Sequence, residues 1–523
     1  MIPPPTHLAR LARAAYVFAR EGVFGAVDPT PLPLPARLAL QAGRLIERRG
    51  GTGVDRVVAA LTRLGPTYVK LGQFLATRPD VVGVVLAREL EKLQDRMPAF
   101  PQAEAEATVA AALDKPLSHI FASFGPAVAA ASIAQVHRAE IIGPDGPHPV
   151  AVKVLRPGVE RRFRADIAAF FSLARYAERV SAEARRLRLI EVVETMWRSV
   201  MLEMDLRLEA AAISEMAENT KADADFRVPV PDWDRTGRQV LTLEWIDATR
   251  LNDRATLQAK GFDLPLLGRT VIQSFLRHAL RDGFFHADMH PGNLFVDDEA
   301  RLVAVDFGIM GRLSSKERRF LAEILYGFIT RNYRRTAEVH FEAGYVPAHH
   351  SVDGFAQAIR AIGEPIHNRT AEEISMAKLL MLLFEVTALF DMRTRPELLL
   401  LQKTMVVVEG VARSFDPKLD MWNVAEPVVR EWVERHLGPA GRLEDVAGTA
   451  AQFGGLFGSV PPLLARAALL VEQLDLITRN GLLLAPESVA AIGKAEARQN
   501  RWMTAALWVI AGLLGCAVWL LTR

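Results

Sequence analysis

Three short motifs, set in a fixed order along the chain, constrain the fold more than any other feature of the sequence. The first is Lys153 within the β-type run VAVKV. The second is the segment His286–Asn293, HADMHPGN, in which an aspartate and an asparagine lie five residues apart. The third begins with Asp306 in the triplet DFG, thirteen residues after that asparagine and directly after an apolar run. A strand lysine followed by two such polar loops is typical of a chain that folds into two lobes around one site.

Phosphoryl transfer needs few protein groups, and each has a candidate in these motifs. Lys153 can project from a rigid strand toward the α- and β-phosphate oxygens of a nucleotide. Asp288 can orient an acceptor hydroxyl or accept its proton, whereas Asn293 and Asp306 offer hard oxygen ligands suited to Mg²⁺. The motifs therefore predict a site for ATP or ADP with Mg²⁺. The alternative is a chance occurrence of common residues, which the shared order disfavours.

Other titratable residues near these motifs have ordinary interpretations. Glu209, in the helical run EMDLRLEAA, is the natural ion-pair partner of Lys153, although a solvated helical carboxylate would look the same in sequence. His286 is more typical of a residue packed beneath the loop than of a metal ligand, and His290 is typical of a turn. A zinc site has little support, because Cys516 is the single cysteine and no HExxH is present.

The glycine-rich loop that usually covers the phosphates is missing. Residues 127–137, AVAAASIAQVH, stand in its place between the first two expected strands. Each added Cβ narrows the backbone options and keeps the loop from folding closely over the phosphates, so nucleotide geometry or preference should differ from that of an ordinary kinase. No GxxxxGK[ST] motif is present, which excludes a P-loop. The predicted nucleotide-binding residues are Ala129, Ala130, Ala131, Ser132, Val136, Lys153, Glu209 and Glu244.

Hydrophobic periodicity predicts a small β-rich lobe followed by a helical lobe. Two helices are expected to meet at Gly65-Pro66, and a further helical stretch to follow the Lys153 strand. The chain after residue 310 is expected to be helical to about residue 500, with no room for a long activation loop after the DFG. The expected elements are helices within 54–93, a hairpin followed by a strand between residues 124 and 154, helices over 163–219, a strand pair over 238–247 ending in a connector at 244–247, a helix around 266–282 and two short strands over 294–308.

Composition narrows the cellular setting. Half of the residues are hydrophobic, 24% are charged and the formal net charge is +2, which favours a folded protein without a broad nucleic-acid-binding face. The single cysteine excludes an intramolecular disulfide and suits a reducing compartment. The first twenty residues lack the apolar core of a secretory signal. Their arginines, at positions 10, 13 and 20, suit either a basic helix on a lipid surface or a helix packed on the domain.

The C-terminus predicts a membrane anchor. Residues 503–521 carry no charged side chain, and as a helix they would cross roughly 28 Å at about 1.5 Å per residue. Trp502 and Trp519 lie near the two ends, where indole rings favour the interface. Cations at positions 494, 498 and 501 precede the segment and only Arg523 follows it, so the bulk of the protein should be cytoplasmic. A buried core helix and a shallow membrane hairpin are the alternatives.

Taken together, these motifs resemble the UbiB protein-kinase-like family, whose eukaryotic relatives are the ADCK proteins. The KxGQ signature of that family is matched by Lys70, Gly72 and Gln73, and its ExD signature by Glu203 and Asp205. The alanine-rich loop, the nucleotide lysine with its glutamate partner, the catalytic loop and the DFG also match. The resemblance covers roughly residues 60–330 and, through the anchor, the C-terminus. Two departures are Ala134, where glycine is common, and a single terminal apolar span where some relatives have two.

The resemblance implies an α+β, bilobal protein-kinase-like fold with an N-terminal helical KxGQ extension and a C-terminal transmembrane helix. The KxGQ helices would pack over the active site where a kinase admits a peptide, with Lys70, Gln73, Glu203 and Asp205 as gating residues. The expected domains are 1–60, a lead-in poor in regular structure; 61–118, the KxGQ extension; 119–246, the kinase-like N-lobe; 247–430, the C-lobe; 431–500, a helical region; and 501–523, the anchor.

The resemblance also implies a role in ubiquinone biosynthesis, in which MgATP is used to handle lipid precursors or to regulate the hydroxylation enzymes. The expected location is a bacterial inner membrane, with one C-terminal span and a cytoplasmic catalytic domain. Expected partners are membrane lipids, polyprenyl-phenol quinone precursors, ubiquinone-biosynthesis enzymes and a second copy in a homodimer, but no nucleic acid. A true protein or small-molecule kinase and a nucleotide-sensing scaffold without turnover are the alternatives. Direct oxidation is not expected, because the sequence shows no flavin fingerprint, haem ligand or facial metal triad.

Overall fold

The structure is a computed structural model of the chain, and it describes residues 4–23, 53–76, 97–180, 182–366 and 396–437, with a few shorter pieces near 41–47, 82–93 and 385–392. The chain divides into two compact units, Met1–Glu434 and Arg435–Arg523. The predicted anchor at 501–523 and most of the predicted region 431–500 lie outside the described residues. Within the described ranges, no helix is both long and apolar enough to cross a membrane.

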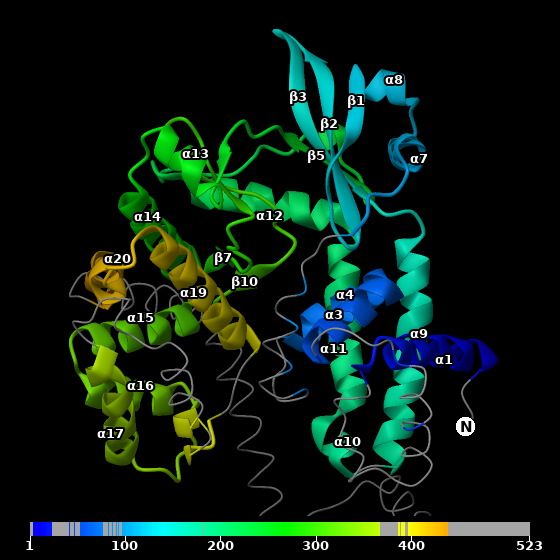
Figure 1. The fold of residues 1–523 in the computed structure, drawn as a ribbon. Helices are drawn as coiled ribbons and strands as arrows, with labels where there is room; N and C mark the ends of the chain where they lie inside the picture. Colours follow the sequence, from blue (N-terminus) through cyan, green and yellow to red (C-terminus); the bar gives the residue numbers. More distant parts are fainter. Residues whose placement is uncertain are drawn as a thin grey trace, which may run out of the picture. The chain divides into compact units, whose positions relative to one another are not determined.

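A four-stranded antiparallel sheet carries the first motif (Figure 1). Its strands, in spatial order, are β1 (Ser123–Ala130), β2 (Ala134–Gly143), β3 (Gly146–Leu155) and β5 (Val240–Glu244). The expected hairpin is confirmed, and its turn is tighter than the sequence GPDGPHP suggests, because β3 begins at Gly146 with a positive φ of 111°. Only glycine adopts that backbone conformation without strain, so it can close the hairpin tightly.

The register of this sheet decides which way Lys153 faces. Lys153 lies opposite Val136 on β2 and Leu241 on β5, and cross-strand partners share a face. The neighbouring pair, Gln135 and Val154, therefore faces the other side. That second face carries an apolar core with α7 (Gln102–Leu113) and α8 (Leu117–Ile120), which frees the Lys153 face for a site.

Two expectations for this part of the chain are wrong in extent. The loop expected over 127–137 is only residues 131–133, because β1 continues through Ala130 and pairs with β2 in the register Ala129↔Val136. Alanine tolerates extended backbone, so the alanine run joins the sheet instead of forming a loop. The strand pair expected over 238–247 is also wrong, since only β5 lies there; the next strand, β6 (Thr249–Arg250), pairs with β8 in a different sheet.

Helices link the sheet to the KxGQ segment. The predicted helical stretch after Lys153 is confirmed as α9 (Val159–Val180), α10 (Ala182–Leu187), α11 (Leu189–Glu203) and α12 (Leu206–Asn219). The break at Gly65-Pro66 is likewise confirmed, between α3 (Gly53–Leu64) and α4 (Pro66–Ala76).

One buried carboxylate ties the N-terminal helices together. Asp166 of α9 accepts hydrogen bonds from Arg10 Nη1 at 2.5 Å and from Thr67 Oγ1 at 2.8 Å. Arg10 belongs to α1 (Pro5–Arg20), which lies against α9. The expectation that residues 1–60 are poor in regular structure is therefore wrong for α1. Its burial against α9 matches the alternative of a helix packed on the domain.

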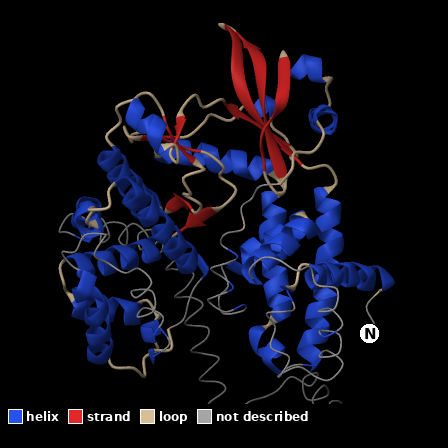
Figure 2. Cartoon of the chain, in the orientation of Figure 1, coloured by secondary structure: helices blue, strands red, loops and turns tan. Residues whose placement is uncertain are grey.

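The rest of the described chain is mainly helical and carries two small sheets, drawn red in Figure 2. Their strands are β4 (Phe226–Arg227), β6, β8 (Leu294–Val296) and β9 (Leu302–Ala304) in one, and β7 (Phe284–His286) and β10 (Met310–Arg312) in the other. The helices are α13 (Arg254–Ala259), α14 (Leu264–Arg277), α15 (Ser315–Ile329), α16 (Tyr333–Glu342), α17 (Val352–Gly363), α19 (Pro396–Phe415) and α20 (Met421–Leu437). Short 3₁₀ turns lie at Trp233–Arg235 (η2) and Glu364–Ile366 (η4), and a π-helix at His278–Asp282 (η3).

The two polar loops connect these short strands. The segment from His286 to Asn293 joins β7 to β8, and Asp306 lies between β9 and β10. The helix α15 begins soon after the DFG at a capping box, in which Ser314 and Glu317 each bond the other's backbone N–H. The prediction that the chain runs almost directly into a helix there is confirmed.

Candidate functional site

Lys153 brings three elements together. Its Nζ lies 2.8 Å from Oε1 of Glu209 on α12 and 2.7 Å from Oδ1 of Asp306 after β9. The three residues are far apart in sequence, so the fold alone assembles the cluster. Glu209 is buried, whereas the Asp306 side chain is 48% exposed. The cluster therefore has an inner, buried carboxylate that fixes the lysine and an outer carboxylate that is about half exposed.

Charge pairing sets the protonation of this cluster. The attraction of the Lys153 ammonium, helped by its hydrogen bond, lowers the pKa of Asp306 to about 2. Burial disfavours the lysine ammonium, but the carboxylates of Asp306 and Glu209 outweigh it and raise the pKa of Lys153. Burial raises the pKa of Glu209, and Lys153 opposes that rise. Near neutral pH, the ammonium and the outer carboxylate are both charged.

The backbone at Asp306 is in the left-handed region, with φ of 63°. A non-glycine residue there carries strain, which aspartate and asparagine tolerate better than most. The following Phe307 is buried, and its ring meets the His286 ring edge-on at a centroid distance of 5.0 Å. This packing holds the strained residue with its carboxylate on Lys153.

The catalytic-loop residues form a second cluster. Nδ2 of Asn293 donates to the Asp288 carboxylate at 3.0 Å and to the Asp288 carbonyl at 3.1 Å, so the amide oxygen remains the group suited to a cation. His286 is buried beneath the loop, where it accepts from Asp288 N and hydrogen-bonds the Val305 carbonyl, and burial lowers its pKa. It is thus a neutral structural histidine, while His290 accepts from Gly292 N within the turn.

The alanine-rich loop is held from one side by a residue that the sequence did not mark. Arg156, just after β3, donates to the carbonyls of Ser132 at 3.3 Å, Ala131 at 3.2 Å and Pro98 at 3.0 Å. Its guanidinium also lies over the Phe100 ring. Ser132, one of the predicted nucleotide-binding residues, is fully buried. Arg156 consequently holds the loop in place through hydrogen bonds to the backbone carbonyls of the loop.

The KxGQ and ExD residues meet only in part. Lys70 of α4 pairs with Glu203 at the end of α11, at 2.6 Å, with both side chains largely buried. The Lys70 charge also helps to lower the pKa of Asp306, so this charge lies within electrostatic range of the nucleotide cluster. Asp205 instead caps α12 and pairs with Arg207 at 2.7 Å. Gln73 lies one turn beyond Lys70, on the same side of α4.

The remaining predicted residues flank the lysine. Val136 shares a sheet face with Lys153 and is half-buried, and Ala129 lies opposite Val136 on β1, whereas Ala130 lies opposite Gln135 and so faces the other side. The Glu244 carboxylate accepts from Arg227 at 2.9 Å, and Arg227 also pairs with Asp297. The Glu244 side chain therefore braces the connector.

The donor set fits magnesium and a polyphosphate. Asp306 and Asn293 supply a carboxylate and an amide oxygen, which are hard ligands, and Lys153 supplies a cation for phosphate oxygens. The two carboxylates use two of the three N–H groups of Lys153, so one remains for a phosphate oxygen. No soft sulfur ligand lies in this set.

Comparisons with known proteins point to one family. Residues 92–340 match the ABC1 atypical kinase-like domain, and residues 359–420 match the UbiB helical domain. Among curated relatives, "Probable protein kinase UbiB" of Marinobacter nauticus is 38% identical over 448 residues, covering 84% of this chain and 81% of that protein. The proteins of the same name from Azotobacter vinelandii and Pseudomonas fluorescens are each 38% identical, over 76% and 79% of this chain and 74% and 77% of theirs.

A solved structure is also similar, at a lower level. The complex of Rv3197 with erythromycin from Mycobacterium tuberculosis is 23% identical, covers 76% of this chain and 97% of that one, and has a TM-score of 0.49, which adds nothing to the assignment. The domain matches confirm the predicted kinase-like fold of mixed α and β structure. The match extends over most of the length of each relative and over most of this chain. The chain belongs to the UbiB family of atypical kinase-like proteins.

Proposed function

We propose that this chain binds MgATP around Lys153 and uses it, as an atypical kinase or ATPase, to support ubiquinone biosynthesis. The observation that carries the nucleotide part is the position of the lysine between Glu209 and Asp306, at 2.8 and 2.7 Å. The quinone part rests on the UbiB name of the curated relatives and on the signature motifs.

Each residue of the site has a role in this proposal. Lys153 contacts phosphate oxygens with its remaining N–H, and Glu209 keeps it in place. Asn293 and Asp306 hold Mg²⁺, which supplies charge neutralisation on the phosphates. Asp288, fixed by Asn293, orients the attacking hydroxyl or water.

The KxGQ helix favours a small or lipid acceptor over a protein acceptor. The Lys70–Glu203 pair holds α4 on α11, close enough for Lys70 to influence Asp306. In this proposal, the helix held at that range hinders the entry of an extended peptide. We therefore propose polyprenyl-phenol quinone precursors and membrane lipids as the molecules handled, with ubiquinone-biosynthesis enzymes and a second copy of the chain as partners. The setting proposed is a bacterial inner membrane, with 501–523 as a single span and the catalytic domain in the cytoplasm.

Phosphate release from MgATP by the purified full-length protein tests this proposal, measured with and without anionic vesicles and a phenolic quinone precursor. The central variant is Asp306→Asn, because asparagine tolerates the left-handed backbone and removes only the charge. Asp298→Asn is the matched control, since Asp298 is an exposed carboxylate paired with Lys260. We expect stimulated release that Asp306→Asn abolishes and Asp298→Asn leaves intact.

The other outcomes separate the alternatives. Tight nucleotide binding without any phosphate release would favour a nucleotide-sensing scaffold. A phosphorylated acceptor would favour a true kinase. Failure of wild-type protein to bind MgATP, or equal binding by Asp306→Asn, would contradict the proposed site.

A further inference from the structure

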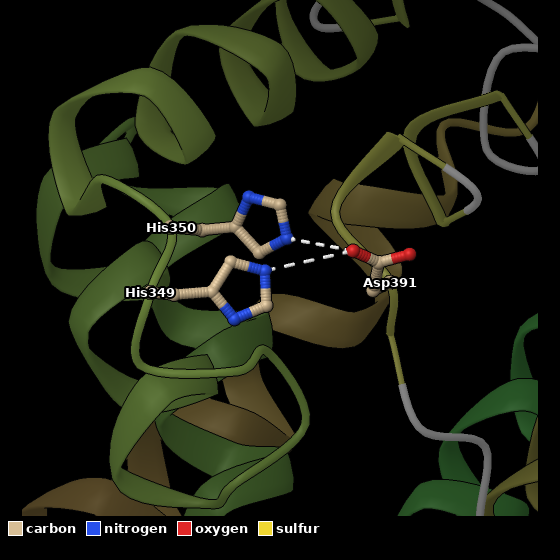
Figure 3. A group of neighbouring side chains, drawn as sticks. All are labelled: His349, His350 and Asp391. Carbon is tan, nitrogen blue, oxygen red and sulfur yellow. Dashed lines mark hydrogen bonds and ion pairs between the residues drawn. The ribbon is translucent and has the colours of Figure 1, made fainter.

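A second cluster of ligating side chains lies away from the nucleotide site. His349 and His350 follow each other in the loop between α16 and α17, and Asp391 lies 41 residues beyond His350. Figure 3 shows both imidazole rings turned toward the same carboxylate oxygen. Nε2 of His350 lies 3.2 Å from Oδ2 of Asp391, and Nε2 of His349 lies 3.6 Å from it. Among the described residues, these three are the group with the arrangement of a metal site.

The spacing of these atoms suits one tetrahedral ion. Zinc binds imidazole nitrogen and carboxylate oxygen at ~2.0–2.1 Å, so neighbouring ligand atoms around it lie about 3.3 Å apart. The two nitrogen–oxygen separations, 3.2 and 3.6 Å, bracket that value, and all three ligand atoms lie within 4.8 Å of one another. Two imidazoles disfavour hard cations such as Mg²⁺ and Ca²⁺, which prefer oxygen ligands. The donor set therefore selects a borderline divalent metal.

The core beneath the cluster holds the ligands in place. Phe390, next to Asp391, is buried in an apolar cluster with Val346 and Phe355, which flank the histidine loop on both sides. The ring of His350 also packs against Phe390 at a centroid distance of 5.2 Å. Each ligand-bearing segment is thus anchored by a buried neighbour. A metal could bind here without large rearrangement of either segment.

Exposure leaves a path for the ion. The side chains of His349 and Asp391 are each 67% exposed, whereas His350 is 19% exposed. An ordinary surface ion pair would account for one histidine beside Asp391, and such pairs contribute about 0–1 kcal/mol. It gives no reason for two adjacent histidines to turn toward one oxygen. That convergence is the arrangement expected of a shared ion.

We propose that His349, His350 and Asp391 form a three-ligand site for Zn²⁺ or a chemically similar divalent metal, with the fourth position open to water. The bound ion would join the segment between two matched regions of the chain to the second of those regions. The histidines lie between the ABC1 domain match, which ends at residue 340, and the UbiB helical match, which begins at residue 359 and contains Asp391. Metal binding would clamp the loop before α17 onto the segment before α19.

The test uses tag-free, full-length protein stripped of metal by chelation. Co²⁺ is titrated and its visible absorption recorded, because tetrahedral cobalt with nitrogen ligands absorbs far more strongly than octahedral cobalt on oxygen ligands. Zinc retained after desalting is measured separately. We expect one tightly bound equivalent, a tetrahedral spectrum and displacement of Co²⁺ by Zn²⁺. His349→Ala and Asp391→Asn should each weaken binding by more than about 100-fold, because each removes a direct ligand.

Controls separate this site from other causes. His119→Ala removes an exposed histidine from α8 and should bind metal like the wild type. Asp306→Asn should also keep the tetrahedral spectrum, since cobalt at the nucleotide site has oxygen ligands. Far-UV circular dichroism checks that the two ligand variants fold. The proposal is overturned if the wild type retains no zinc and shows no tetrahedral spectrum, or if both folded ligand variants bind as tightly as the wild type.

Discussion

Lys153 is the residue on which the nucleotide site depends, and its buried partner is the more sensitive of its two contacts. Glu209 is desolvated on α12, while Asp306 faces solvent. The free energy gained from a charge pair is larger where water is excluded. Changes at Glu209 should therefore affect both folding and binding, whereas changes at Asp306 should act mainly on the ligand.

Glu209→Gln replaces the inner carboxylate by a neutral amide of similar size. We expect a loss of about 1–3 kcal/mol in the free energy of unfolding, because Lys153 loses a charged hydrogen-bond partner, together with weaker nucleotide binding. Thermal unfolding and nucleotide titration would measure the two effects. Glu215→Gln, on the same helix but in an exposed pair with Arg312, should change the free energy by less than about 1 kcal/mol. Equal effects of the two variants would refute this assignment of roles.

The lowered pKa of Asp223 predicts that the fold loses stability in acid. Burial alone would raise its pKa, but hydrogen bonds from His278 and Arg281 outweigh burial and hold the pKa of Asp223 well below its ordinary value. A carboxyl group with a depressed folded pKa stabilises the fold above its unfolded pKa of about 3.9, and this stabilisation is lost as the pH falls toward the folded pKa.

The corresponding experiment compares the melting temperature of the wild type with that of Asp223→Asn from pH 7 to pH 3. The wild type should be more stable at pH 7, and the difference should shrink below about pH 4 as the wild-type carboxylate is protonated. A difference that stays constant down to pH 3 would mean that Asp223 is not the titrating group.

At the level of residues, the sequence indicated those groups whose chemistry is distinctive and missed those whose role comes from position. Lys153, Asp288, Asn293 and Asp306 stand in motifs whose spacing is itself informative. Arg156 could not be singled out, because an arginine after a strand has no marked spacing and its carbonyl partners are set by the loop geometry. The histidine pair and Asp391 escaped notice for a similar reason. Their 41-residue separation matches no metal-ligand pattern, and only the fold brings them together.

Among the elements, α4 and α11 are joined by a contact between the KxGQ and ExD motifs. Lys70 and Glu203 are both largely buried and pair at 2.6 Å, so they bridge the KxGQ helix to the helix that precedes Asp205. Gly72 lies on the same helix where a Cβ would come within 2.4 Å of Leu93 Cδ1. The glycine lets the leucine approach, and the ion pair fixes the position of the helix.

A double-mutant cycle of Lys70→Met and Glu203→Gln measures this bridge. We expect a coupling free energy of about 1–2 kcal/mol, because the pair is shielded from water. Hydrogen exchange over residues 53–76 should also speed up in either single variant. The exposed pair Glu194–Arg198, one helical turn apart on α11, serves as control and should show coupling below about 0.5 kcal/mol. Coupling in the buried pair no larger than in the control would contradict the bracing role.

Elements with a strong period were predicted well, and elements decided by tertiary pairing were not. The strands β2 and β3 alternate apolar and polar residues, which predicts a hairpin. Pro66 has no backbone N–H to donate, which predicts the break between the two helices. The alanine run 127–131 has no such period. It joins the sheet because β2 supplies hydrogen-bond partners, which local sequence does not reveal. The strand after β5 was misassigned because β6 takes its partner, β8, from a distant segment.

For the whole molecule, the apolar C-terminus makes a prediction independent of the site. Deleting residues 501–523 should move the protein from the membrane fraction to the supernatant after high-speed centrifugation, since the deleted segment contains the long uncharged run. Nucleotide binding by the truncated chain should match that of the full-length protein. A truncated chain that still sediments entirely with membranes would show that another surface provides the attachment.

The pinned alanine loop has a consequence for the rate of nucleotide exchange. Because Arg156 hydrogen-bonds the carbonyls of Ala131 and Ser132, we expect the loop to stay in place when a nucleotide enters or leaves. A site without a moving cover has no closing step, so binding should follow a single exponential whose rate rises linearly with nucleotide concentration, without saturation. Release should likewise be limited by the contacts themselves. The residence time of the nucleotide would then depend on magnesium concentration more than on any motion of the protein.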